Sequence, residues 1–69
     1  MVNIRLEFYE CEHSNDLDRY TNDIYECGGK IIKEELNSEA ETGIVWFDVE
    51  DDKTFFNRFK ETESYDFIN

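Results

Sequence analysis

The 69-residue sequence predicts one small α+β domain spanning residues 1–69. Three observations predict this fold class. Residues 2–9 alternate apolar and polar, residues 17–27 carry apolar side chains at helical spacing, and residues 44–49 are rich in β-branched and aromatic types. A chain of this length buries only about 60% of its surface on folding, so we expect a thin core.

The first half of the chain predicts a strand followed by a helix. The apolar positions of the strand are Val2, Ile4, Leu6 and Phe8. Ser14 or Asn15 is expected to cap the helix. The helix then carries one apolar stripe made of Leu17, Tyr20, Ile24 and Cys27. Gly28-Gly29 should end it, because glycine readily adopts a left-handed backbone.

The second half predicts a hairpin and a second helix. Residues 30–37 form a strand whose register stays open, because Ile31 and Ile32 are adjacent. Residues 37–43 are polar and predict the hairpin loop, and residues 44–49 predict the return strand.

The rest of the chain predicts a helix and a short terminal segment. Asp51 or Asp52 should cap the helix, with three phenylalanines on one face: Phe55, Phe56 and Phe59. Residues 64–68 either add a short fourth strand or fray.

The order β-α-β-β-α, with this optional fourth strand, predicts a small ferredoxin-like plait. Two helices would cover one face of an antiparallel sheet, with the first and third strands in the middle. The other face would be open to solvent, and would carry Arg5, Glu7, Tyr9, Ile44, Trp46 and Asp48.

Trp46 on that open face is a candidate anchor for a partner. Aromatic side chains on such a sheet resemble those of RNA-recognition modules, which stack bases on their strands. The Lys/Arg-Gly-aromatic signature of those modules is absent, however, and the neighbouring residues are acidic. Alternatively, Trp46 packs under the C-terminal segment or in a sheet-to-sheet homodimer.

Charge excludes several function classes. The chain has 7 Lys and Arg against 18 Asp and Glu, a formal net charge of −11. Direct binding to nucleic acid or to an anionic membrane needs clustered basic residues, so neither is expected. At the same time, 39% hydrophobic and 16% aromatic residues are too many for a disordered acidic tail.

So large a charge destabilises a thin-cored fold through self-repulsion. A function that would maintain it is attraction to a basic partner. Carboxylates on a helix and hairpin can imitate phosphates, which predicts a stoichiometric inhibitor that occupies the basic groove of a nucleic-acid-processing protein. In size and composition the chain is similar to small phage-encoded inhibitors of restriction, CRISPR or repair enzymes. The expected contacts are Asp16, Asp23, Glu26, Glu34, Glu35, Glu39 and Glu41, with Trp46 as an anchor.

The alternative hypothesis is a small regulatory or ligand-binding plait that forms a homodimer through its open sheet face. Enzyme activity, a cofactor and a metal are not expected. Cys11, His13 and Cys27 are at most three zinc ligands, whereas a structural site needs four. His13 also lacks the partners of a catalytic triad.

The compartment predicted from the sequence is the cytoplasm. Two cysteines are too few for a secreted disulfide framework, and a helix between Cys11 and Cys27 would keep them too far apart for a bridge. The N-terminus lacks the apolar segment of a secretory signal, and no stretch is long enough to span a bilayer.

Overall fold

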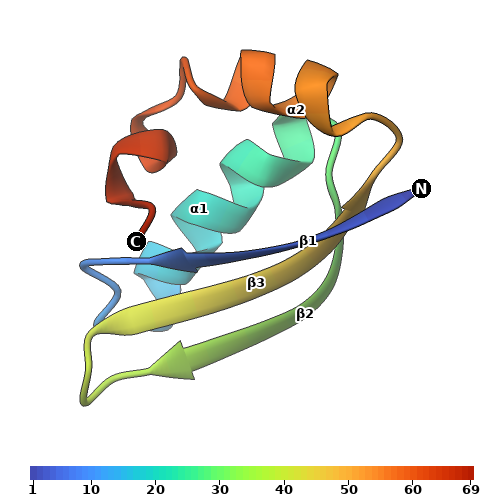
Figure 1. The fold of residues 1–69 in the computed structure, drawn as a ribbon. Coiled ribbons are helices and arrows are strands. Elements are labelled where there is room, and N and C mark those ends of the chain that lie inside the picture. Colours follow the sequence, from blue (N-terminus) through green and yellow to red (C-terminus); the bar gives the residue numbers. More distant parts are fainter.

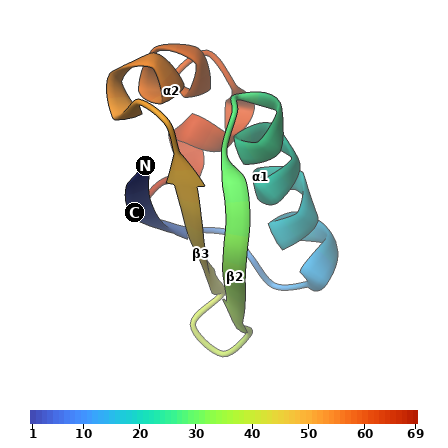
Figure 2. The same cartoon turned by 90° about the vertical axis from the view of Figure 1, so that its right-hand side faces the viewer.

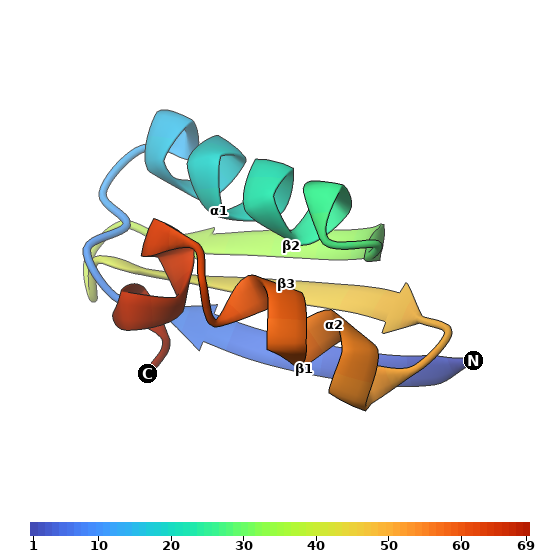
Figure 3. The same ribbon diagram turned by 90° about the horizontal axis from the view of Figure 1, so that it is seen from above.

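The computed structural model describes residues 1–69 and shows a three-stranded antiparallel sheet with two helices on one face (Figures 1 and 3). The strands are β1 (Val2–Phe8), β2 (Lys30–Asn37) and β3 (Thr42–Val49). The helices are α1 (Ser14–Glu26) and α2 (Asp52–Phe59), followed by a 3₁₀ helix, η1 (Glu63–Phe67). This confirms the predicted α+β class and the order of its first five elements.

The strands lie in the order β1-β3-β2, and β3 pairs antiparallel with both neighbours. β1 and β2 therefore run in the same direction, and α1 carries the chain across β3 from one to the other. Figure 2 shows β2 and β3 side by side, with α1 next to β2 and the hairpin loop projecting beyond the helix. Opposite Val45 of β3 stand Leu6 of β1 and Glu34 of β2.

The core lies between the sheet and the helices, as the apolar periodicities predict. The predicted stripe of α1 is buried, and so are Val45, Phe47 and Val49 of β3. From α2 come Phe55 and Phe59, with Phe56 half-buried beside them. Together these residues form one apolar layer on a single face of the sheet.

The open register of β2 is resolved by a bulge between Ile31 and Lys33. The extra residue lets Ile31 pack against the core while Lys33 stands opposite Trp46 on the other face. Ile32, at the bulge, is exposed. Two adjacent isoleucines therefore do not share one face of the strand.

The N-terminus of α1 differs from the prediction. The helix begins at Ser14, and His13, with an extended backbone, is the cap in place of Ser14 or Asn15. The Asp16 carboxylate accepts hydrogen bonds from the backbone nitrogens of Glu12 and His13, both at 3.2 Å. A carboxylate in the first turn also matches the positive end of the helix dipole, so Asp16 provides the stabilisation expected of a cap side chain.

The other predicted helix ends are confirmed. Gly28 has φ of 101° just beyond α1, where a side chain would be strained. Asp51 caps α2, since its carboxylate accepts a hydrogen bond from the backbone nitrogen of Thr54 at 3.0 Å. These bonds hold the pKa of the Asp51 carboxyl below its usual value.

The C-terminal segment forms neither of its two predicted structures. Residues 63–67 form the 3₁₀ helix η1, and only Ile68 makes a bridge, with Phe8. Two backbone hydrogen bonds of 2.7 Å flank this bridge, from Tyr9 N to the Phe67 carbonyl and from Asn69 N to the Glu7 carbonyl. The segment is thus fastened along the outer edge of β1.

Candidate functional site

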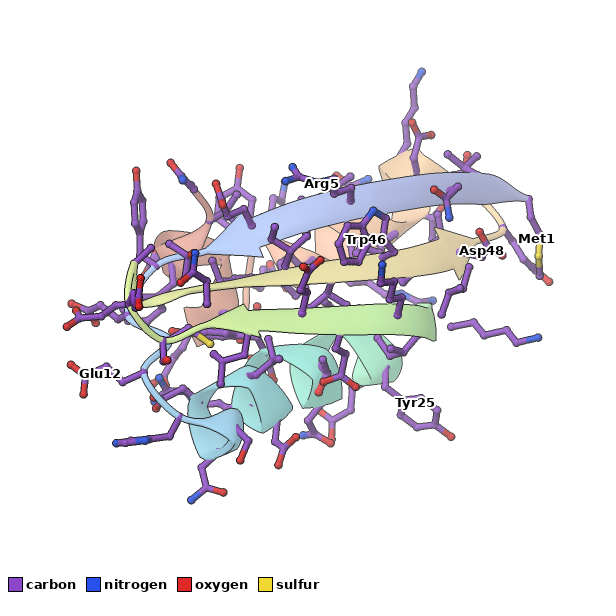
Figure 4. All side chains as sticks on the ribbon, turned by 90° about the horizontal axis from the view of Figure 1, so that it is seen from below. Met1, Arg5, Glu12, Tyr25, Trp46 and Asp48 are labelled. Atoms are coloured by element: carbon purple, nitrogen blue, oxygen red, sulfur yellow. The ribbon has the colours of Figure 1, made fainter.

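Two surfaces of the molecule carry part of the residues that the sequence singled out. The first is the open face of the sheet, seen from below in Figure 4, with Trp46 at its centre. Trp46 is half-buried and stands between Arg5 of β1 and Lys33 of β2. The Arg5 guanidinium carbon lies 5.9 Å from the indole centroid, and the Lys33 ammonium nitrogen lies 4.9 Å from it. Both distances suit a cation–π interaction, so two cations flank the predicted anchor.

The rows on either side of Trp46 carry further charge. Towards the hairpin loop, Ile44 stands between Glu7 and Glu35. Towards the other end, Asp48 stands between Lys30 and Asn3, whose amide donates a hydrogen bond of 3.1 Å to it. The face therefore holds three cations and three carboxylates, and its formal charge is zero on a chain of −11.

Tyr9, the remaining residue predicted for this face, lies just beyond the last residue of β1. Its carbonyl accepts a hydrogen bond of 3.0 Å from the Tyr20 hydroxyl. Because its nitrogen also bonds to Phe67, Tyr9 is held at the junction of β1, α1 and η1.

The second surface lies at the hairpin end of the molecule, and we call it the acidic end. Its four carboxylates are those of Glu10, Glu39, Glu41 and Asp66. Three of them, from Glu10, Glu41 and Asp66, line one open depression beside Tyr9 and Phe67. Glu39 lines a neighbouring depression, which Glu7 and Glu35 also border. No Lys, Arg or His lines either depression, and the nearest cation that the structure records against their lining is the Arg19 guanidinium, whose carbon lies 5.7 Å from the centroid of the Phe67 ring.

Two turns of unusual backbone build the acidic end. Glu10 has φ of 51° and Glu41 has φ of 57°, and they are the only residues other than glycine with positive φ. Left-handed backbone costs a non-glycine residue roughly 1–2 kcal/mol. A hydrogen bond of 2.9 Å from Cys11 N to the Glu41 carbonyl joins the two turns.

The eight predicted contact residues are distributed over several surfaces. Glu39 and Glu41 lie at the acidic end, with Glu35 bordering it from the open face. Adjacent in sequence, Glu34 and Glu35 point to opposite faces of β2. The three predicted residues of α1 are spread along the helix: Asp16, Asp23 and Glu26.

Sequence reasoning did not select Glu7, Glu10 or Asp66 as contacts. Glu7 and Glu10 have a sequence signal, since they flank the end of the first predicted strand. Asp66 has none, because its place depends on how η1 folds back onto β1.

Asp23 has a structural partner rather than a free carboxylate. The buried Ser64 hydroxyl donates a short hydrogen bond to Asp23, which ties η1 to α1. Hydrogen bonds to charged groups contribute about 1.5–3 kcal/mol. We expect Asp23→Asn to lower the free energy of unfolding by about 1–2 kcal/mol. Glu26→Gln, three residues along on the exposed surface, should change it by less than about 0.5 kcal/mol. Urea denaturation of the two variants beside the native chain checks this, and equal effects would contradict it.

The two cysteines are free and buried. Burial raises the pKa of the Cys11 thiol, and the Asp16 carboxylate raises it further. Burial likewise raises the pKa of Cys27, with Asp23 adding to the effect. A nucleophilic or metal-binding cysteine needs the opposite shift, towards the thiolate. No group of three or more His, Cys, Asp or Glu side chains is arranged to hold a metal ion.

A third depression, at the opposite end of the sheet, has mixed charge. Lys30 and Arg58 line it together with carboxylates, among them Asp48 and Asp51. The contrast shows that the lack of cations is a property of the hairpin end and not of every concave surface on this chain.

Comparison of the chain with protein-family models, with curated proteins and with solved structures finds no match in any of the three. Neither helix has the length and apolar character required to cross a bilayer.

Proposed function

We propose that this chain is a small acidic protein that binds the basic nucleic-acid-binding groove of a partner protein and inhibits it by competing with DNA or RNA. The observation that carries the proposal is the acidic end: four carboxylates gathered over two adjoining depressions that no cation lines. Long-range attraction from a net charge of −11 would steer a basic partner towards it.

Backbone strain supports the same surface. Glu10 and Glu41 adopt left-handed conformations at a cost that glycine would avoid. Strained residues cluster at functional sites, where the strained geometry itself is used. In this proposal, the two turns present carboxylates that a glycine could not supply.

The proposal extends to the fold and the compartment. The bridge between Phe8 and Ile68 lies at the edge of β1, where a ferredoxin-like plait has its fourth strand. We therefore regard the fold as such a plait with the fourth strand reduced to one bridge. The partner would be a cytoplasmic nucleic-acid-processing factor, such as the restriction, CRISPR or repair enzymes that phage-encoded inhibitors target. The inhibitor itself would need no catalysis, cofactor or metal.

Neutralising the acidic end should abolish partner capture. The test variant combines Glu10→Gln, Glu39→Gln and Glu41→Gln, and the control combines Asp18→Asn, Glu50→Gln and Glu61→Gln, which are exposed elsewhere. Both variants have the same net charge. Each is used as bait in nuclease-treated extract of the native host, with elution by a salt gradient.

The native chain and the control should retain a basic nucleic-acid-binding protein that added DNA displaces, while the test variant should lose it. Each lost charge contact would weaken binding roughly two- to fivefold. Equal retention by the two variants would contradict the acidic end as the site. Retention that neither salt nor DNA affects would contradict nucleic-acid mimicry.

A regulatory or ligand-binding plait that dimerises is the second candidate, and the zero formal charge of the open sheet face favours it. It predicts a dimer that Trp46→Glu disrupts.

A further inference from the structure

We infer that two copies of this chain associate face to face through the open side of the sheet, related by a two-fold axis that runs across the strands between Ile44 and Trp46. The inference rests on how charge is arranged on that face, and it does not depend on the proposed partner.

The face presents two rows of opposite charge. The carboxylate row is Glu7, Ile44 and Glu35, and the cation row is Arg5, Trp46 and Lys33, each taken in the order β1, β3, β2. The rows are two residues apart along the strands, or about 6.7 Å. Each row has an apolar residue in its centre and like charges at both ends.

This pattern is complementary to itself under one rotation. A half-turn about an axis across the strands, midway between the rows, places each row over the other row of the second copy. Glu7 then faces the second copy's Arg5, and Glu35 faces its Lys33. Ile44 packs against the second copy's Trp46. A two-fold interface requires this reciprocity: if one residue of the first copy contacts a given residue of the second, the same two residues also meet with the copies exchanged.

The other face-to-face rotation is disfavoured. A half-turn about an axis parallel to the strands would place β1 over β2 and superimpose rows of the same kind. Arg5 would meet the second copy's Lys33, and Glu7 would meet its Glu35, so that like charges would oppose one another in both rows. The charge pattern therefore selects the first arrangement.

Charge on the rest of the chain also favours this face. Two molecules of −11 repel each other wherever their acidic surfaces meet. The open face has equal numbers of cations and carboxylates around an apolar centre, which is the anatomy of an interface core with a polar rim. The acidic end lies beyond it, so the dimer would present one acidic end at each extremity.

The size of the face predicts a weak dimer. Three strands about 4.8 Å apart and up to eight residues long, at about 3.3 Å each, cover roughly 14 by 26 Å. This is below the roughly 800 Å² per partner of a stable interface. We therefore expect a reversible dimer that is detectable by about 1 mM protein, rather than a permanent one.

Charge reversal and exchange on β1 test the arrangement by sedimentation equilibrium. Arg5→Glu alone would oppose carboxylates twice, and Glu7→Arg alone would oppose cations twice. Each should weaken association roughly tenfold, although the two variants change net charge in opposite directions. The double variant Arg5→Glu/Glu7→Arg restores the opposite pairs at the native net charge, so its association should return to within about threefold of native. Circular dichroism checks that the variants fold.

The exchange Lys33→Glu/Glu35→Lys on β2 gives an independent version of the same rescue. A native chain that stays monomeric up to about 1 mM would overturn the inference. So would tighter association of Arg5→Glu, since that result belongs to the axis parallel to the strands. If neither double variant associates more tightly than the folded single variants it combines, the proposed arrangement of the two copies is excluded.

Discussion

Phe8→Ala is expected to remove a large part of the free energy of unfolding. Phe8 is completely buried at the end of β1. Its ring stacks on Tyr20 with centroids 4.5 Å apart and meets the edge of Phe59 at 6.3 Å. A buried Phe→Ala change costs about 3–5 kcal/mol. A domain of 69 residues has a total stability of only about 3–10 kcal/mol.

The place of Phe8 in the fold should add to the loss of stability. Phe8 makes the bridge to Ile68, so its side chain packs where η1 is fastened to the sheet. Its removal should loosen α1 and η1 together. Urea unfolding can be followed by the fluorescence of Trp46, the only tryptophan. Phe56→Ala, at a half-buried position, is the matched control and should cost about half as much or less. A loss below about 1.5 kcal/mol for Phe8→Ala would contradict this account of the core.

Periodicity predicted the core because burial on one face imposes it. The alternation along β1 and the stripe of α1 each place apolar residues on the side that meets the other layer. Such patterns are local, so they are readable without knowing the partner surface. For the same reason, the division of β3 into a buried face and an open face with Trp46 was predicted and is confirmed.

Features that depend on tertiary contacts were not predictable. The residues after Thr62 adopt η1 because Ser64 is buried against Asp23 and Ile68 reaches Phe8, and both contacts join distant segments. The cap of α1 depends on Asp16 rather than on the favoured cap residues. In η1, contacts between distant segments outweigh local propensity. The cap of α1 is local by contrast, because Asp16 bonds backbone groups only three and four residues before it.

The predicted contact residues share a surface only in part. Net charge alone indicated an acidic surface, and Glu39 and Glu41 do lie together with other carboxylates. Asp16 and Asp23 were predicted as charged contacts, but both also stabilise the fold: Asp16 accepts two backbone hydrogen bonds, and Asp23 accepts one from Ser64. Whether a carboxylate caps a helix or faces solvent depends on neighbours that composition does not reveal.

The role of Gly43 differs from the one that the sequence predicted. Glycine at the end of a polar run predicted part of the hairpin loop, but Gly43 lies inside β3 and is buried. The left-handed backbone of the loop is supplied by Glu41 instead. Gly43 is required because Leu17 and Cys11 pack directly over it. Glycine in a strand often marks such a close approach to the backbone.

Gly43→Ala should therefore destabilise the chain by about 1–3 kcal/mol through overpacking. An added Cβ would lie 2.7 Å from Leu17 Cδ1 and 2.8 Å from Cys11 Sγ. Both neighbours are buried, so any shift of their side chains must be accommodated within the packed core. Removing the sulfur with Cys11→Ala should relieve part of the clash, and the double variant should be more stable than the sum of the single losses predicts.

Gly28→Ala is the matched control for this cycle. Its Cβ would have no neighbour within 4 Å, and its cost should come from φ of 101° alone. That cost should not change when Cys11→Ala is present, because nothing at Gly28 touches Cys11. Denaturant midpoints for the single and double variants give both coupling energies. If Cys11→Ala leaves the cost of Gly43→Ala unchanged, close packing by the thiol is not the reason that β3 needs a glycine there.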